Sequence, residues 1–315
     1  MDSGLGFTYQ YCDVAVRSTL PIHELVSCAA EVDYDCEFSL LNAPTSSADD
    51  FERKWRLPNS DAMLSCRATD ADQWRIRFGG QVLFEIDLDS GHILCRFLGG
   101  APSNRDRHLL LDQVLSRLLA HHGRFMVHSS CVESNGRAIM FLGDSRAGKS
   151  TMALGMHKLD FSVLADDCVR AQLSNSGIRV AGTYPSLRVS SEVREELLTS
   201  KAMSIDVDGT NKDRIVFAQQ EVRSAELVVA YCLAGVHNTE NRIKVERMSK
   251  CAALMHVMKQ VFHLDIEDRT RLEQKLGEAE HFVHRVPMYE VSYPHEYRML
   301  PSVCQFLRRH AGLAA

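Results

Sequence analysis

The sequence predicts an α/β protein that begins with a small β-rich domain. Short alternating runs at hairpin spacing fill residues 1–105, and a strand, a glycine-rich turn and a helix follow one another over 137–159. The polar, glycine-containing segment Gly99–Asn104 separates the two patterns. At 315 residues the chain is also longer than one typical domain of about 100–200 residues. We therefore expect a β-rich N-terminal domain over 1–105 and an α/β domain over 106–315.

Turn residues divide the first domain into short strands. The predicted strands are Phe7–Val16, Cys36–Leu41, Met63–Arg67, Trp74–Phe78, Gln81–Ile86 and His92–Phe97. Gly79-Gly80 and Asp89-Ser90-Gly91 separate the last three strands at the spacing of hairpin turns, which predicts an antiparallel meander. In this domain only Pro21–Ala30 is predicted to be helical.

The second domain mixes helical and strand patterns. Leucines at helical spacing predict a helix over Leu109–Leu119, and Asn135-Gly136 predicts a hairpin turn between strands Phe125–Val132 and Arg137–Leu142. The other predicted helices are Lys149–Leu159, Glu192–Met203, Ser249–Phe262, Glu267–His284 and one that begins at Pro301. The other predicted strands are Phe161–Ala165, a hairpin around Asn175-Ser176-Gly177, Leu227–Gly235 and Tyr289–Tyr293, and Asp206–Arg214 is predicted as an open loop.

Composition excludes several classes of protein. With 36 Lys and Arg against 41 Asp and Glu, the formal net charge is -5, so the chain has no basic field that would bind nucleic acid non-specifically. The ten cysteines include no C-x-x-C pair, which favours reduced thiols in a cytoplasmic protein. The longest apolar run, Leu227–Val236, is about half the length of a membrane-spanning helix, so we expect no membrane insertion.

One segment carries a phosphate-binding pattern. Gly143-Asp144-Ser145-Arg146-Ala147-Gly148-Lys149-Ser150 fits G-x-x-x-x-G-K-S/T, and it lies between an apolar strand and a helix, as this P-loop pattern requires. The backbone N–H groups of such a loop and the positive end of the helix attract phosphate. We expect the loop through Thr151 to bind nucleotide phosphates, Lys149 to reach the β- and γ-phosphates, and Ser150 to hold Mg²⁺. An ordinary glycine turn is the alternative.

Two carboxylates and a histidine are expected near this loop. Asp166 and Asp167 end an apolar strand only 17 and 18 residues after Lys149, which places them at the same edge of the sheet. Because adjacent strand residues point to opposite sides, one can face the metal and the other the phosphoryl acceptor, whose proton an Asp can take. Taken alone, the pair would be a solvated turn. His128 lies on the strand before the loop strand, where a core histidine is the alternative interpretation.

These residues and their spacing resemble the catalytic core of HPr kinase/phosphorylase, a serine kinase that shares its nucleotide-binding fold with ATP-dependent PEP carboxykinases. The matching segments are His128, Gly143-Asp144-Ser145, Gly148-Lys149-Ser150, Ala153-Leu154 and Leu164-Ala165-Asp166-Asp167. The resemblance implies ATP and Mg²⁺ as cofactors and Asp167 as the proton acceptor from the substrate hydroxyl. It further implies an active-site role for His128 and a metal-binding or supporting role for Asp166.

The sequence also departs from this family. Arg146 stands where the family usually has a glycine, and Glu192 lies at about the distance of its later metal-binding Glu, but follows Ser190 and Ser191 as at a helix start. The N-terminal region differs from the HPr kinase N-terminal domain. A small β-rich part before a short kinase core resembles the HPr-kinase-related proteins encoded with ribosomally made peptides. These include lasso-peptide tail kinases, which phosphorylate a serine at the C-terminus of the precursor.

We therefore predict a phosphotransferase that acts on an alcohol group, a Ser hydroxyl of a peptide or small protein. The basic residues Arg188, Lys212 and Arg214 are candidate contacts to substrate or phosphate, with structural or solvated roles as the alternatives. Phosphorylation of HPr or of a small metabolite remains open, as does a non-catalytic module that binds nucleotide and peptide. The resemblance is also compatible with a homo-oligomer.

Overall fold

The computed structural model divides into two compact units, Met1–Val114 and Leu115–Ala315, which we call the N-terminal and C-terminal units. The described residues are 6–28, 37–44, 53–56, 63–70, 72–78, 82–97, 103–197, 203–206, 212–217, 224–234 and 242–313. Across these ranges, none of the helices combines the length and the apolar character that a bilayer crossing would require.

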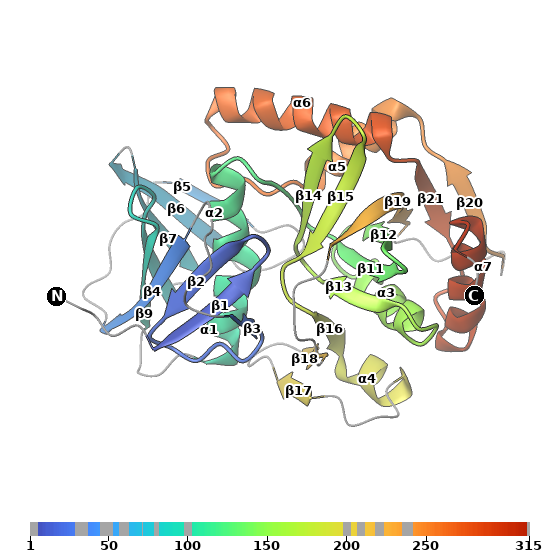
Figure 1. Ribbon diagram of the computed structural model, residues 1–315, viewed down its shortest axis with the longest axis horizontal. Helices are drawn as coiled ribbons and strands as arrows, with labels where there is room; N and C mark the ends of the chain where they lie inside the picture. The colour runs from blue at the N-terminus through green and yellow to red at the C-terminus, as the bar shows by residue number, and fades with distance from the viewer. Residues whose placement is uncertain are drawn as a thin grey trace. The chain divides into compact units, whose positions relative to one another are not determined.

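A nine-stranded sheet forms the N-terminal unit, in the order β3-β1-β2-β4-β9-β8-β7-β6-β5 (Figure 1). Its strands are β1 (Phe7–Tyr11), β2 (Val14–Ser18), β3 (Val26–Ser27), β4 (Glu37–Pro44), β5 (Arg53–Arg56), β6 (Met63–Asp70), β7 (Gln73–Phe78), β8 (Val82–Asp87) and β9 (His92–Phe97). β4 pairs in parallel with β2 and β9, while β6 to β9 form the predicted antiparallel meander. Along β7, Trp74, Ile76 and Phe78 are buried and alternate with more exposed residues, as in a strand with one face on the core.

A helical segment leads from the end of the N-terminal unit into the C-terminal unit. It consists of α1 (Asn104–Leu109), a π-helical turn η1 (Leu110–Leu115) and α2 (Ser116–His121). Its start is a capping box, in which the Ser103 side chain accepts from the backbone N–H of Asp106 and the Asp106 carboxylate accepts from the backbone N–H of Ser103. The predicted helix therefore begins five residues before Leu109, where this cap fixes it.

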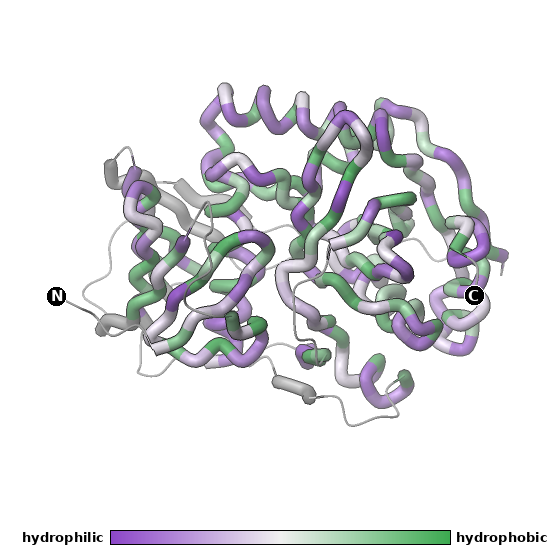
Figure 2. Tube along the Cα trace, in the orientation of Figure 1, coloured by the Kyte–Doolittle hydropathy of each residue, from purple (hydrophilic) through white to green (hydrophobic). Residues whose placement is uncertain are grey.

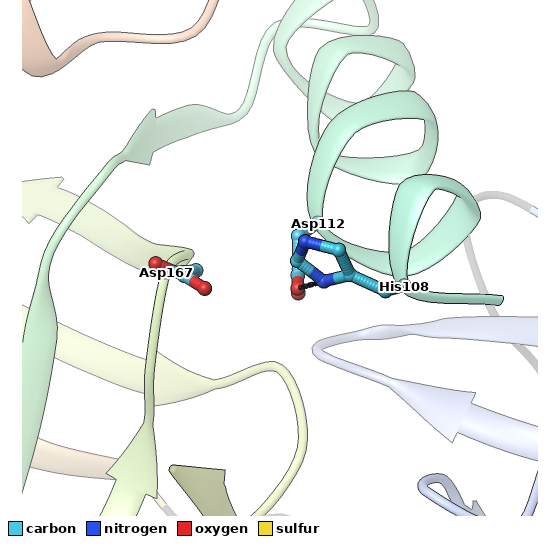
Figure 3. A group of neighbouring side chains, drawn as sticks. All are labelled: His108, Asp112 and Asp167. Carbon is cyan, nitrogen blue, oxygen red and sulfur yellow. Dashed lines mark ion pairs between the residues drawn. The ribbon is translucent and has the colours of Figure 1, made fainter. Parts of the chain in front are cut away.

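One hydrogen bond joins the helical segment to β1, and one ion pair stabilises the segment internally. The Tyr11 hydroxyl donates a 2.7 Å hydrogen bond to the backbone carbonyl of Leu111. His108 and Asp112, one helical turn apart and both buried, form an ion pair (Figure 3). Pairs at this spacing lie on one face of a helix.

The C-terminal unit is built on a mixed sheet with a parallel centre. Its strands are β10 (Phe125–Val127), β11 (Ser130–Ser134), β12 (Arg137–Leu142), β13 (Ser162–Ala165), β14 (Val169–Ser174), β15 (Gly177–Gly182), β19 (Ser224–Leu233), β20 (Lys244–Arg247) and β21 (Met288–Ser292). β12, β19 and β21 are parallel neighbours, and β11 pairs antiparallel with both β12 and β13. At the end of β12 the order is therefore β13-β11-β12-β19-β21.

Helices cover both faces of this sheet. They are α3 (Lys149–His157), α4 (Ser191–Leu197), α5 (Lys250–Gln260), α6 (Arg269–Arg285) and α7 (Leu300–His310), with a short 3₁₀ turn η2 (Tyr297–Met299). Ile139 and Phe141 of β12 pack in one core with α3 and α7, while Met140 and Leu142 pack in a second core with α5 and α6. Figure 2 shows the hydrophobic colour of the central strands and the mixed colour of the long α6.

A second, three-stranded sheet has the order β16-β18-β17, with β16 (Ser186–Ser190), β17 (Met203–Asp206) and β18 (Lys212–Val216). β16 leads directly into α4, whose start is capped by the Ser190 hydroxyl, which accepts from the backbone N–H of Val193 at 3.3 Å. The helix start expected at this point is thus confirmed, with Ser190 as its cap.

Several predicted elements are wrong in the N-terminal unit. Pro21–Ala30 is not a helix in its described part: a turn precedes β3, which pairs with Tyr9 and Gln10 of β1. Phe7–Val16 is two strands joined by a turn at Cys12-Asp13, where Cys12 has φ 55°. The predicted turn Gly79-Gly80 and most of the segment Gly99–Asn104 lie outside the described residues.

Other corrections concern the C-terminal unit. Phe125–Val132 is not one strand, because β10 pairs with β14 and β11 pairs with β12 and β13. The helix predicted to end at Met203 is described only as far as Leu197, and Met203 is the first residue of β17. The prediction of an open loop over Asp206–Arg214 is also wrong at the C-terminal end of that range, because Lys212 begins β18.

Candidate functional site

The glycine-rich segment forms a loop between β12 and α3. Gly143 has φ 143° and Gly148 has φ 92°, values that side chains other than glycine rarely adopt. A Cβ on Gly143 would lie 2.9 Å from the Leu233 carbonyl oxygen, and one on Gly148 would lie 2.8 Å from the Tyr293 hydroxyl. The loop therefore needs glycine at both ends, for backbone conformation and for space.

Lys149, the first residue of α3, is buried beneath this loop. Its Nζ donates to the backbone carbonyls of Gly143 at 2.9 Å and Asp144 at 3.2 Å. Burial lowers the pKa of Lys149, and the negative charges of Asp167 and Asp166 oppose that shift. The Lys149 side chain thus lies inside the loop, hydrogen-bonded to its backbone and close to two carboxylates.

Asp166 is a buried carboxylate surrounded by hydrogen-bond donors. It accepts from the Ser130 hydroxyl, from the Ser150 hydroxyl and from the backbone N–H of Arg188, the last at 2.8 Å. Burial and the neighbouring charge of Asp167 raise the pKa of Asp166, while these hydrogen bonds lower it. The second residue of α3 is therefore joined through its hydroxyl to the acidic end of β13.

The backbone turns sharply at Asp167, drawn in Figure 3 at the end of its strand. Asp167 has φ 61°, and the N–H of Cys168 donates across it to the Asp166 carbonyl at 2.7 Å. A left-handed conformation at a residue other than glycine is costly and is concentrated at functional sites. The Asp167 carboxylate lies 3.5 Å from the Arg188 guanidinium, whereas Asp166 accepts from the backbone N–H of the same residue.

His128 follows β10, and its side chain contacts the backbone of Asp167. Its Nδ1 lies 2.8 Å from the Asp167 carbonyl oxygen, and its own backbone N–H donates to the Gln260 carbonyl at 2.7 Å. Burial and the Lys149 charge lower the pKa of His128 to about 4, against the opposing effect of Asp167. The imidazole is therefore neutral near pH 7, and Nδ1 carries the proton that it donates to the carbonyl.

Two cations from the three-stranded sheet lie near these carboxylates. Arg188 is on β16, and Lys212 on β18 pairs with Ser190, two residues further along β16. Burial and the positive charge of Arg188 lower the pKa of Lys212, and the charges of Asp167 and Asp166 raise it. The exposed Arg146, which has φ 68° at the tip of the loop, adds to the positive charge near Lys212.

The structure places two other predicted site residues differently. Arg214 is only 2% exposed, and its guanidinium donates to the hydroxyls of Tyr184 and Ser186 and lies 4.9 Å from the centre of the Tyr184 ring. Glu192 is exposed in the first turn of α4 and hydrogen-bonds to Tyr297. Arg214 thus packs beside Tyr184 and Ser186, and Glu192 beside Tyr297.

Sequence reasoning missed Ser130 as part of the site. Its hydroxyl is fully buried and donates to Asp166, 36 residues further along the chain. A serine at the start of an apolar strand gives no local signal of this contact. Only the pairing of β11 with β13 brings Ser130 and Asp166 together.

Comparisons with known proteins add distant structural similarity. No protein-family model and no curated protein matches the chain. Among solved structures, the HPr(Ser) kinase/phosphatase from Coxiella burnetii is similar with a TM-score of 0.31 and 9% identity, over 59% of this chain and 95% of that chain. This score is too low to establish a common fold. The resemblance to that family rests on the motifs.

Proposed function

We propose that this protein is an ATP- and Mg²⁺-dependent kinase that phosphorylates a serine hydroxyl of a peptide or small protein. The observation that carries the proposal is that the Ser150 hydroxyl lies close enough to the Asp166 carboxylate to lower its pKa. This contact joins the end of the glycine-rich loop to the acidic end of β13. A serine after the loop lysine and an aspartate at a neighbouring strand end are the pair that holds Mg²⁺ in P-loop nucleotide enzymes.

The residues present fit such a nucleotide. A loop whose two glycines admit no Cβ lets backbone approach a phosphate closely, and Lys149 lies directly beneath it. The hydroxyl of Ser150 and the carboxylate of Asp166 supply the hard oxygen ligands that Mg²⁺ prefers. When held by Ser150 and Asp166, Mg²⁺ would neutralise negative charge on the phosphates during transfer.

Asp167 is the residue that we assign to the acceptor hydroxyl. In the step proposed, the serine oxygen forms a bond to the γ-phosphorus, the bond from that phosphorus to the leaving ADP oxygen breaks, and the serine proton passes to the Asp167 carboxylate. The ion pair with Arg188 and the hydrogen bond from His128 to its carbonyl hold Asp167 in position. Phosphoryl transfer depends on such positioning, since the protein does little covalent chemistry itself.

The charges around Asp167 support a specific acceptor, the C-terminal serine of a ribosomally made peptide precursor. Such a residue carries its hydroxyl and a carboxylate close together. Arg188 and Lys212 lie near Asp167 on β16 and β18, and they could bind that carboxylate while the hydroxyl faces Asp167. An internal serine offers no such anion.

The test is mass spectrometry of a peptide panel incubated with the protein and Mg-ATP. The panel pairs each peptide ending in Ser with its C-terminal amide, and adds an internal-Ser peptide, HPr and free serine. We expect phosphate on the free-acid peptides and little on their amides. Asp167→Asn should bind Mg-ATP as before and transfer about 10²- to 10⁴-fold more slowly, the usual contribution of a general base.

Each other outcome has a defined meaning. Equal loss of ATP binding and transfer in Asp167→Asn would refute the role assigned to this residue. If only HPr or only free serine were phosphorylated, the protein would still be a kinase, but a peptide would not be its acceptor. Mg-ATP binding without transfer to any member of the panel would favour a nucleotide-dependent binding module.

A further inference from the structure

Two aromatic rings lie beside the phosphate loop. Tyr293 follows β21, and its hydroxyl is the atom that a Cβ on Gly148 would meet at 2.8 Å. The rings of Tyr293 and His295 are stacked, with centroids 4.7 Å apart and planes 11° from parallel. Tyr293 is buried whereas His295 is exposed, so the imidazole is the ring of this pair that lies at the surface.

The order of the strands fixes the direction in which this pair lies from the loop. At the end of β12 the sheet runs β13-β11-β12-β19-β21. Asp166 and Asp167 follow β13, and Tyr293 follows β21, so the carboxylates and the aromatic pair lie on opposite sides of the loop that follows β12. A nucleotide whose γ-phosphate faces Asp167 therefore extends its ribose and base toward β21.

The distance also suits a nucleotide. β21 is two strands from β12, which at strand spacing is about 10 Å. The α-phosphate and the ribose span this interval and place the base near residues 293–295.

The segment that carries the aromatic pair is followed by α7, which packs against α3. Cys304 of α7 packs on Met152, with the two sulfurs 3.6 Å apart, and Leu300 packs against Gly155 at a distance that leaves no room for a Cβ. α7 follows the segment that carries Tyr293 and His295, so its packing anchors that segment beside the loop. An aromatic side chain at this position offers a surface for base stacking, because every base has a π-face.

We propose that the base of the nucleotide stacks on His295, with Tyr293 supporting the imidazole from below. This inference rests on the proposed function and assigns the base-binding part of the same site. Stacking contributes to affinity without reading the edge of the base, so it favours a purine for its larger ring surface and leaves the choice between adenine and guanine to other contacts.

The test distinguishes binding of the base from binding of the phosphates. Isothermal titration calorimetry in Mg²⁺ compares ATP with inorganic tripolyphosphate, which carries the phosphate chain and no base. For His295→Ala we expect the Kd for ATP to rise about tenfold, within the range of one base-aromatic stack, and the Kd for tripolyphosphate to stay unchanged. His295→Phe, which keeps a flat ring, should restore ATP binding, and His284→Ala, an exposed histidine on α6, is the matched control.

The remaining outcomes overturn the proposal in distinguishable ways. If His295→Ala binds ATP as tightly as the unmodified protein, the base lies elsewhere and the proposed kinase is unaffected. If ATP and tripolyphosphate weaken together, His295 acts on the phosphates or on the fold. If the unmodified protein binds neither ligand, the proposed function itself fails, and the base site with it.

Discussion

The imidazole Nδ1 of His128 lies 2.8 Å from the backbone carbonyl oxygen of Asp167, 39 residues further along the chain. A carbonyl oxygen only accepts, so the histidine donates. It thereby holds the main chain at Asp167, whose φ of 61° is uncommon for a residue other than glycine. The histidine thus acts on the site through the position of Asp167.

Replacing His128 should therefore separate catalysis from nucleotide binding. We expect His128→Phe to lower kcat for phosphoryl transfer about 10- to 100-fold, as the loss of other orienting partners does, with little change in the Kd for Mg-ATP. His128→Asn places an amide N–H near the position of Nδ1 and should recover part of the rate. Steady-state kinetics with titration calorimetry checks both variants, and an equal loss of binding in the two would show a structural role instead.

Lys149 should control the affinity for the phosphates. Lys149→Met keeps the length of the side chain and removes the ammonium group. Hydrogen bonds to charged groups contribute about 1.5–3 kcal/mol, so the Kd for Mg-ATP should rise about 10- to 100-fold. Lys158→Met, an exposed lysine at the end of the same helix, should leave the Kd unchanged. Similar Kd values for the two variants would exclude the phosphate contact.

The local chemistry of the chain predicted the parts of the fold that depend on a few consecutive residues. Asn135-Gly136 gave the correct hairpin because both residues adopt positive φ, at 53° and 74°. The order strand, glycine-rich loop, helix also follows from local signals, since the positive φ of Gly143 and Gly148 favours glycine. Both features were predictable without knowledge of any distant contact.

The errors lie where distant segments decide the structure. Val26–Ser27 has a helical neighbourhood in the sequence, but it pairs with β1. Lys212 and Arg214 follow a polar stretch typical of a loop, yet pairing with β16 makes them part of a strand. The same pairing buries Arg214 against Tyr184, a contact that the sequence could not indicate because the two residues are 30 positions apart.

A histidine outside the candidate site should affect stability at low pH. Burial and the positive charges of Arg271 and His122 lower the pKa of His121 to about 4, while Asp268 and Asp265 act in the opposite direction. In the unfolded chain a histidine titrates near about 6.5, so between these values the unfolded state binds more protons than the native state. The stability contributed by neutral His121 is therefore complete above pH 6.5 and is lost as the pH falls toward 4.

His121→Gln should accordingly flatten the acid side of the stability profile. Urea unfolding at a series of pH values from 7 to 5 measures it. We expect the free energy of unfolding of the variant to fall less over this range than that of the unmodified protein. His284→Gln, at an exposed position of α6, should leave the slope as it is. Parallel profiles for all three proteins would show that His121 does not contribute.

A pair of glycine substitutions tests the shape of the phosphate loop. Gly148 has φ 92°, and its Cβ would lie 2.8 Å from the Tyr293 hydroxyl, so Gly148→Ala should lower the free energy of unfolding by about 1–3 kcal/mol and weaken Mg-ATP binding. Gly277 lies inside α6 with nothing within 4 Å of its Cβ position. Gly277→Ala should therefore raise the free energy of unfolding by about 0.5–1 kcal/mol and leave nucleotide binding unchanged. Thermal unfolding with and without Mg-ATP measures both effects. A Gly148→Ala protein as stable as the unmodified one would show that the loop adopts a different backbone conformation in solution.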